Sequence, residues 1–230
     1  MAVLIIGASS GIGYSLVQCF RKQEVHCVVA SRYPEKFDGL DAYFVDLSQA
    51  DESQATLGRI FQDHREIDTV VLISGVGHIE GELNVGTANE TMAINVAGFT
   101  GVAYAAANFF EEKGRGHLIA VTSVAALRGG SLSLSYNATK AFQKSLLEGL
   151  KCRFYRKQPE IAVSEVRAGF VDTKMMKAEK PFWVASPEVV ADSIYALTQS
   201  KKPLVYVLRR WRIVGWLLTV LPSWIYKRLG

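Results

Sequence analysis

The chain has few of the residues that build disulfide frameworks or metal sites. Its three cysteines, Cys19, Cys27 and Cys152, are too few and too scattered for either. The four histidines, at positions 26, 64, 78 and 117, share no spacing typical of metal ligands. The sequence therefore predicts no metal site, and free thiols in a cytoplasmic protein.

The apolar stretches at the two ends of the chain are short. The apolar start, residues 1–6, has no basic region and leads directly into glycines, so it predicts a strand and not a signal peptide. The apolar stretch 213–221 is much shorter than the ~20 residues needed to span a bilayer. With 49% hydrophobic and 21% charged residues, the 230-residue chain is expected to form one globular domain with a substantial core.

Acidic residues do not occur from position 193 onward. This segment carries seven basic residues, more than the +4 net charge of the whole chain, so the preceding part is net negative. The basic character belongs to the C-terminal part alone, which argues against a nucleic-acid-binding protein.

Short apolar runs alternate with helix-length segments along the chain. The predicted strands span residues 3–6, 25–30, 42–45, 69–73, 117–122, 161–166 and 204–208. The predicted helices span about 11–23, 49–65, 86–113 and 134–157, and another begins at Ser186-Pro187-Glu188. This alternation predicts an α/β fold in a single domain: a doubly wound, Rossmann-type parallel sheet with helices on both faces, and a ligand beyond the carboxyl ends of its strands.

A glycine-rich turn follows the first predicted strand and leads into a helix. It reads Gly7-Ala8-Ser9-Ser10-Gly11-Ile12-Gly13, with glycines spaced G-x-x-x-G-x-G. Such a turn lets the backbone approach a pyrophosphate, whose negative charge the N–H groups of the helix start can bind. We therefore expect cofactor contacts from Gly7, Ser9, Ser10, Gly11, Ile12 and Gly13. A glycine-rich surface turn is the alternative.

The ends of the second and third strands indicate which dinucleotide binds. An acidic residue after the second strand would select NAD, but Ser31 and Arg32 stand there. The planar cation of Arg32 suits the 2′-phosphate of NADP(H) and favours it over NAD(H); a merely solvated arginine is the alternative. Asp46, next to Leu47 at the end of the third strand, is placed to accept a hydrogen bond from the adenine amine.

A phenol and an ammonium lie four residues apart, at Tyr136 and Lys140. On a helix this spacing places both side chains on one face. A nearby cation lowers the pKa of a phenol, which would make Tyr136 useful as an acid or base near neutral pH. Taken alone, such a pair is more often part of a solvated helix surface.

Other motifs are in register with this pair. They are the glycine turn, Asp46-Leu47, Asn95 in Asn95-Val96-Ala97-Gly98, Ser123 thirteen residues before Tyr136, the Y-x-x-x-K motif of Tyr136 and Lys140, and Gly169 with Thr173. In these motifs the chain, up to about position 207, resembles the short-chain dehydrogenase/reductase family in its compact single-domain form.

The resemblance implies an NADP-dependent oxidoreductase that transfers hydride between nicotinamide and a carbonyl or alcohol substrate, expected to be apolar. Tyr136 would exchange a proton with the substrate oxygen that Ser123 holds. Lys140 would lower the phenol pKa, and Asn95 would fix a water linking Lys140 to solvent. Further cofactor contacts would come from Ser74, Gly75, Tyr136, Lys140, Gly169, Val171 and Thr173. A non-catalytic NADP-sensing regulatory protein on the same fold is the alternative.

The chain departs from the family pattern at two places. Asn-Asn-Ala-Gly is replaced by Leu72-Ile73-Ser74-Gly75, which loses side chains that brace the central sheet. Pro-Gly is replaced by Ala168-Gly169, which loosens the turn at the nicotinamide pocket. These changes affect the expected rigidity and cofactor affinity, but no reacting group is lost.

Two segments near the C-terminus keep more than one interpretation. Residues 174–183, with two methionines and two aromatic residues, form either a lid over an apolar pocket or an anchor to the core. The basic tail 209–230 holds three of the four tryptophans. Its part 209–228 lies in a membrane interface, giving a peripheral location, or else packs on a neighbouring subunit or covers the substrate cleft. A homo-oligomer built on helices 86–113 and 134–157 is expected from the family.

Overall fold

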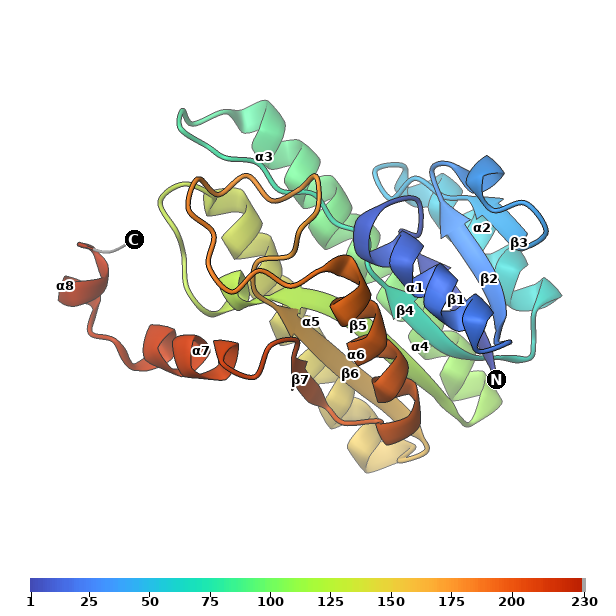
Figure 1. Ribbon diagram of the computed structural model, residues 1–230. Coiled ribbons are helices and arrows are strands. Elements are labelled where there is room, and N and C mark those ends of the chain that lie inside the picture. The colour runs from blue at the N-terminus through green and yellow to red at the C-terminus, as the bar shows by residue number, and fades with distance from the viewer. Residues whose placement is uncertain (229–230) are drawn as a thin grey trace.

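Seven parallel strands form one twisted sheet at the centre of the computed structural model, which describes residues 1–228 (Figure 1). The strands are β1 (Ala2–Ile6), β2 (His26–Ser31), β3 (Asp41–Phe44), β4 (Ile67–Leu72), β5 (Gly116–Ser123), β6 (Ile161–Ala168) and β7 (Leu204–Tyr206). Their order is β3-β2-β1-β4-β5-β6-β7, so the chain runs outward from β1 in both directions. The predicted doubly wound parallel sheet is confirmed.

Helices cover both faces of this sheet. Those packed on it or beside it are α1 (Gly11–Lys22), α2 (Ala50–Asp63), α3 (Val85–Met92), α4 (Phe99–Lys113), α5 (Leu134–Lys157) and α6 (Pro187–Ser200). Two short helices, α7 (Trp211–Val220) and α8 (Ser223–Tyr226), form the tail, which extends away from the body of the protein (Figure 1). The observed helix ends differ from the predicted ones by at most two residues, and helix 134–157 has the predicted ends.

The core has two layers because successive side chains of a strand point to opposite faces. In β1, Leu4 and Ile6 belong to the layer that also contains residues of α2, α4 and α5. Val3 and Ile5 belong to the layer that contains residues of α1 and α6. Since both faces are covered, β1 is buried along its whole length, which explains its uninterrupted apolar sequence.

The predicted helix 86–113 is interrupted by a wider turn. Between α3 and α4, residues Ala93–Gly98 form a π-helix, and Asn95 lies in it with no exposed surface. A π-helical turn inserts a residue into the helix and is frequent at functional sites. By length and composition Val85–Lys113 could cross a membrane, but 56% of its most apolar window is buried in this fold, so its apolar residues pack on the protein core.

The tail is held to the body by the loop that follows β5. The guanidinium of Arg128 donates hydrogen bonds to the carbonyls of Leu218 and Leu221 and lies 4.2 Å from the ring centroid of Tyr226. The Tyr226 hydroxyl donates to the carbonyl of Gly129. The tail is therefore a defined part of the fold at the entrance of the site described next.

Candidate active site

A cavity of about 830 Å³ opens at the carboxyl ends of the strands, where parallel α/β sheets bind their ligands. Nearly all the residues predicted to bind cofactor or to react line its wall. These are Gly7, Ser9, Ser10, Gly11, Ile12, Ser31, Arg32, Asp46, Leu47, Ser74, Gly75, Ser123, Tyr136, Lys140, Gly169, Val171 and Thr173. The two others, Gly13 and Asn95, lie behind this wall and shape it.

The glycine turn is packed too closely to accept side chains. Gly7 has φ +95°, and a Cβ there would lie 2.4 Å from Ser74 Oγ. A Cβ on Gly13 would lie 2.2 Å from the carbonyl oxygen of Gly7, and one on Gly11 would touch Thr173. The first turn of α1 contains no acidic residue, and its capping residue Ser10 makes no side-chain cap bond. The turn thus offers free N–H groups in a close-fitting cradle, which suits a pyrophosphate.

Two cations lie beyond the end of β2, at the side of the cavity formed by the glycine turn. Arg32 is exposed and, within residues 1–228, no carboxylate forms an ion pair with it. The ammonium of Lys36 lies 4.8 Å from the ring centroid of Tyr33 and donates to the carbonyl of Ser9 at 3.4 Å. Lys36 was not identified from the sequence, because only the short helical turn Pro34–Lys36 brings it back to the glycine turn.

Asp46 is held by its own turn. Its Oδ1 accepts hydrogen bonds from the backbone N–H of Ser48 at 3.0 Å and from the Ser48 hydroxyl at 2.8 Å. The following residue, Leu47, packs so closely on the π-helix that a Cβ on Gly98 would lie 2.5 Å from the Leu47 carbonyl oxygen. Asp46 and Leu47 therefore have a fixed place in the wall of the cavity.

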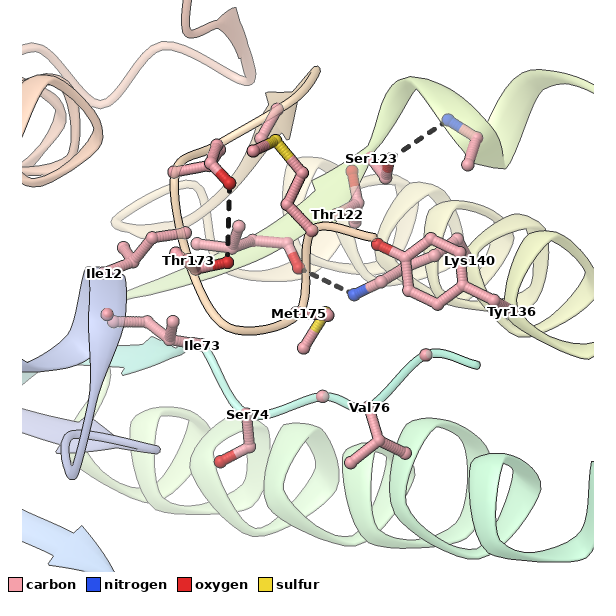
Figure 2. A pocket seen from close by; sticks show the side chains of 18 of the residues that line it. Ile12, Ile73, Ser74, Val76, Thr122, Ser123, Tyr136, Lys140, Thr173 and Met175 are labelled. Atoms are coloured by element: carbon pink, nitrogen blue, oxygen red, sulfur yellow. Dashed lines mark hydrogen bonds between the residues drawn. The ribbon is translucent and has the colours of Figure 1, made fainter. Parts of the chain in front are cut away.

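The three reacting side chains converge from β5 and α5 (Figure 2). Lys140 is 4% exposed, and burial lowers its pKa to about 8, an effect that the Glu165 carboxylate partly offsets. Burial raises the pKa of Tyr136, while its contact with the Ser123 hydroxyl acts in the opposite direction. The predicted lowering of the Tyr136 pKa by Lys140 is therefore wrong. Loss of water around the phenol is the largest cause of its raised pKa, and Lys140, whose Nζ lies 5.7 Å from the ring centroid, does not reverse it.

Asn95 braces the loop after β4. Its Oδ1 accepts from the N–H of Val76 at 2.9 Å, and its Nδ2 donates to the Val76 carbonyl at 2.7 Å and to Thr139 Oγ1 at 3.1 Å. This loop is the one in which the family's bracing asparagines are replaced, so Asn95 supplies support at that point. Its carbonyl oxygen accepts from Gln143 Nε2, and the Gln143 Oε1 accepts from Lys140 Nζ. The water that Asn95 is expected to fix between Lys140 and solvent stays a prediction.

The start of α5 is tied to the same loop by Glu80, which the sequence did not reveal. The Glu80 carboxylate accepts from the N–H of Ser135 at 2.9 Å and from its hydroxyl at 2.6 Å, and these bonds lower the pKa of Glu80. A carboxylate at this end of a helix also interacts favourably with its dipole. A Cβ on Gly77 would lie 2.8 Å from the Tyr136 ring, so the loop covers the phenol closely.

The segment after β6 is both an anchor and a lining of the cavity. Phe182 stacks on Trp211 at 5.0 Å between ring centroids, and Trp183 meets Trp211 edge-on at 5.9 Å. Met175 and Met176, by contrast, line the cavity. The two interpretations of residues 174–183 therefore apply to different parts of the segment.

The tail covers part of the cleft, as one of its three interpretations predicted. Trp211 and Leu218 both line the cavity. A Cβ on Gly169 would lie 2.0 Å from the Trp211 ring, so the glycine after Ala168 is required by the tail. Trp211 thus gives shape to the turn that the missing proline leaves loose.

This site agrees with a match to known families. The model of the short chain dehydrogenase family matches residues 1–182. This range includes the glycine turn and the reacting side chains, and it ends before the tail. The chain belongs to the short chain dehydrogenase family. It is therefore an oxidoreductase, and the identification made from the motifs is confirmed.

Individual members show how widely the fold is shared. An uncharacterized oxidoreductase of Staphylococcus haemolyticus is 27% identical over 213 residues, covering 85% of this chain and 90% of the relative. A short chain dehydrogenase from Burkholderia cenocepacia, solved with NADP, is 18% identical with a TM-score of 0.84, covering 99% of this short chain dehydrogenase and 96% of that chain. One from Burkholderia phymatum, solved with NAD, is also 18% identical, with a TM-score of 0.80 and coverages of 94% and 92%.

A cluster of histidines and carboxylates lies at the opposite, amino-terminal edge of the sheet. His26 Nε2 is 3.2 Å from Asp41 Oδ2, and His64 Nδ1 is 3.3 Å from Glu66 Oε1. The hydroxyl of Tyr43 lies 2.8 Å from His64 Nε2. The sequence spacing did not bring these residues together, but their contacts are satisfied among themselves, and the absence of a metal site stays a prediction.

Proposed function

We propose that this short chain dehydrogenase is an NADP(H)-dependent carbonyl reductase or alcohol dehydrogenase. It transfers hydride between the nicotinamide and a carbonyl or alcohol substrate. The observation that carries the proposal is the convergence of Ser123, Tyr136 and Lys140 in one cavity with the glycine turn. The methionines and Trp211 in the wall favour an apolar substrate, since they offer adaptable apolar contacts.

NADP(H) is the proposed cofactor, in preference to NAD(H). Structural neighbours have been solved with either dinucleotide, so the fold does not select one. Arg32 and Lys36 support NADP(H), because two cations beside the glycine turn suit a 2′-phosphate. When bound, the nicotinamide supplies or accepts the hydride, and the protein positions and polarises the substrate.

The protein side of the reaction is a proton transfer at the substrate oxygen. The raised pKa keeps the Tyr136 phenol protonated at neutral pH, which suits it to donate a proton to that oxygen during carbonyl reduction. The Ser123 hydroxyl would hold the same oxygen as a preorganised donor where negative charge develops. Lys140 would stabilise the phenolate left after the transfer.

Replacing Tyr136 by Phe tests this assignment. We expect turnover to fall by roughly 10²–10⁴-fold, because the proton donor is lost, while the Kd for NADPH stays within about twofold. Tyr104→Phe, at an exposed tyrosine of α4, is the matched control and should behave as the unchanged protein. Substantial reductase activity in Tyr136→Phe, measured with aldehydes, ketones and 3-ketoacyl compounds, would contradict the role of the phenol.

The same substrate panel distinguishes the alternative function. A non-catalytic NADP sensor would bind NADPH in a fluorescence titration but would turn over none of the panel. The presence of Ser123, Tyr136 and Lys140 in one cavity does not favour this alternative, because a sensor needs no proton-transfer groups.

We also propose that the tail contacts the surface of an anionic membrane. The inward face of α7 carries Trp211 and Gly215, both buried. Its outward face carries Ile213, Trp216, Leu217 and Val220, which are 62%, 62%, 44% and 52% exposed, at the i, i+3, i+4, i+7 spacing of one helix face. We call these four residues the apolar stripe. Trp224 of α8 is 66% exposed beside it.

Charge favours lipid over a second copy of the chain. Residues 209–228 contain five basic residues, Arg209, Arg210, Arg212, Lys227 and Arg228, and no acidic one. A twofold pairing of stripe on stripe would place cations against cations, whereas anionic headgroups would compensate them. Tryptophans flanked by basic residues are typical of helices that lie in the membrane interface.

Vesicle co-sedimentation tests the tail. We expect the protein to sediment with phosphatidylglycerol vesicles and not with phosphatidylcholine vesicles, and the double variant Ile213→Ser/Trp216→Ser to lose this binding. Leu83→Ser, which changes an 85% exposed leucine elsewhere, is the control. Equal sedimentation of the control and the double variant would refute lipid contact. A fall in oligomer size in the double variant alone would assign the stripe to a second copy.

A further inference from the structure

Gln143 is a fully buried amide that the sequence did not single out. It lies three residues after Lys140 on α5, so both side chains project from the same face of the helix. Its Oε1 accepts a hydrogen bond from Lys140 Nζ at 2.9 Å, and its Nε2 donates one to the carbonyl oxygen of Asn95, also at 2.9 Å. One side chain therefore joins the cation of the site to the π-helix.

A polar residue at this position needs an explanation. The buried residues that follow Gln143 on α5, Leu147, Leu150 and Phe154, are apolar and pack in the core. Burying an amide is unfavourable unless its hydrogen bonds are made, so an apolar residue would be the simpler filling. Gln143 meets this condition because the donor and acceptor of its amide both have a partner.

We propose that Gln143 is a positioning residue: its amide bridges Lys140 Nζ to the Asn95 carbonyl and holds the ammonium at the reacting edge of α5. The inference rests on the proposed function, in which Lys140 supports the proton transfer by Tyr136. The bridge has a fixed direction, since the oxygen of the amide must face Lys140 and its nitrogen must face Asn95.

The hydrogen bonds of Lys140 show what the bridge achieves. An ammonium has three N–H donors. One donates to Gln143 and a second to the carbonyl of Val121 at 3.3 Å, so the third remains for a group in the cavity that Lys140 lines. Without Gln143, the side chain would lose the shorter of its two anchors.

The charged groups around Lys140 are few, so Gln143 should have a measurable effect on the pKa of Lys140. Glu165 on β6 is the charged group whose field favours the ammonium, but Arg167 pairs with that carboxylate at 2.7 Å. Tyr136, on the same helix, is a neutral phenol at neutral pH, since burial raises its pKa further above the ordinary value of 10.0. The hydrogen-bond acceptor from β5 is the uncharged carbonyl of Val121. The Gln143 oxygen is thus the nearest acceptor for the charge of Lys140.

Two substitutions with opposite effects test the proposal. Gln143→Leu removes the acceptor, and we expect the titration midpoint of Lys140 to fall by about one pH unit from its value near 8. Gln143→Glu keeps the length of the side chain and places a charged acceptor beside Lys140, although it loses the donor to the Asn95 carbonyl, so the midpoint should rise. In carbonyl reduction, the alkaline limb of the pH profile should move in the same two directions.

The titration is read directly by NMR of protein labelled with ¹³C at lysine Cε, with the Lys140 signal assigned from Lys140→Met. Gln158→Leu is the matched control, because that amide donates to the carbonyl of Glu111 at the far end of α5. Unchanged midpoints in both Gln143 variants would overturn the proposal, as would shifts in the same direction. If Gln143→Leu does not fold, Gln143→Met, which is as long and flexible but has no amide acceptor, should lower the Lys140 midpoint in its place.

This experiment is independent of the proposed function. The Lys140 midpoint is measured without substrate, so it reports the bridge even if no carbonyl compound is turned over. Conversely, an active Tyr136→Phe variant would refute the proton-transfer role and leave the Lys140 titration unaffected.

Discussion

The choice between NADP(H) and NAD(H) is expected to depend on Arg32. The structure places this side chain at the end of β2, exposed and free of ion pairs within residues 1–228. A guanidinium can donate two parallel hydrogen bonds to a phosphate. Replacing it by Ser removes both bonds without introducing a new charge, whereas Arg32→Asp adds repulsion from the 2′-phosphate.

The size of the effect follows from this exposure. A hydrogen bond to a charged group contributes about 1.5–3 kcal/mol, and solvent screening keeps an exposed pair near the lower end. We therefore expect Arg32→Ser to weaken NADPH binding roughly 10- to 100-fold, at about 1.4 kcal/mol per factor of ten. NADH binding should change by no more than about threefold, because NADH has no 2′-phosphate. Lys36 remains near the glycine turn, so the loss should not be complete.

Fluorescence titrations with NADPH and NADH measure the two dissociation constants. Arg59→Ser, at an exposed arginine of α2, is the control for the loss of one surface charge. Raising the ionic strength to about 1 M should reduce the difference between the unchanged protein and Arg32→Ser, since the Debye length falls to about 3 Å. An NADPH to NADH preference that Arg32→Ser leaves unchanged would refute the 2′-phosphate argument.

Two further predictions concern stability. Gly169→Ala forces the Trp211 ring to move, and overpacking of this kind typically costs about 1–3 kcal/mol of stability. We expect a lower Tm and altered tryptophan fluorescence. Gly149→Ala is the control, because its new methyl group meets nothing within 4 Å and should not lower the Tm. Burial lowers the pKa of His117 to about 4, from the usual value of 6.5 that holds in the unfolded chain. Between these two pH values the unfolded chain therefore binds a proton at His117 that the folded chain does not bind. The free energy of unfolding should fall by up to about 3 kcal/mol between pH 7 and pH 4 on this account. His117→Asn should lack this part of the decline in urea titrations; an identical pH dependence would contradict it.

The fold and the main motifs could be predicted because they are local properties of the chain. The apolar strands, the glycine turn and the helix starts follow from residues within a few positions of each other, and parallel crossovers bring all strand ends to one edge. This is why Gly7, Arg32 and Tyr136, more than 100 residues apart at the extremes, were expected in one site and line one cavity. The cradle around Gly7 and Gly13 was likewise predictable from the residue type alone.

The partners of these residues depend on contacts between distant parts of the chain. Gln143 meets Asn95, and Glu80 caps α5, only because the π-helix and the loop after β4 pack on that helix. No periodicity in the sequence encodes such pairings. The same holds for Trp211, whose packing on Gly169 joins the tail to the turn after β6.

The sequence by itself determined the doubly wound parallel fold, the family and the residues able to react, because these depend on residue type and spacing. Tertiary structure alone decided the electrostatic state of the site. The spacing of Tyr136 and Lys140 predicted a lowered phenol pKa, but burial by residues from several elements raises it. Desolvation is a property of everything packed around a group, so four residues of helix could place the phenol beside the ammonium without setting its pKa.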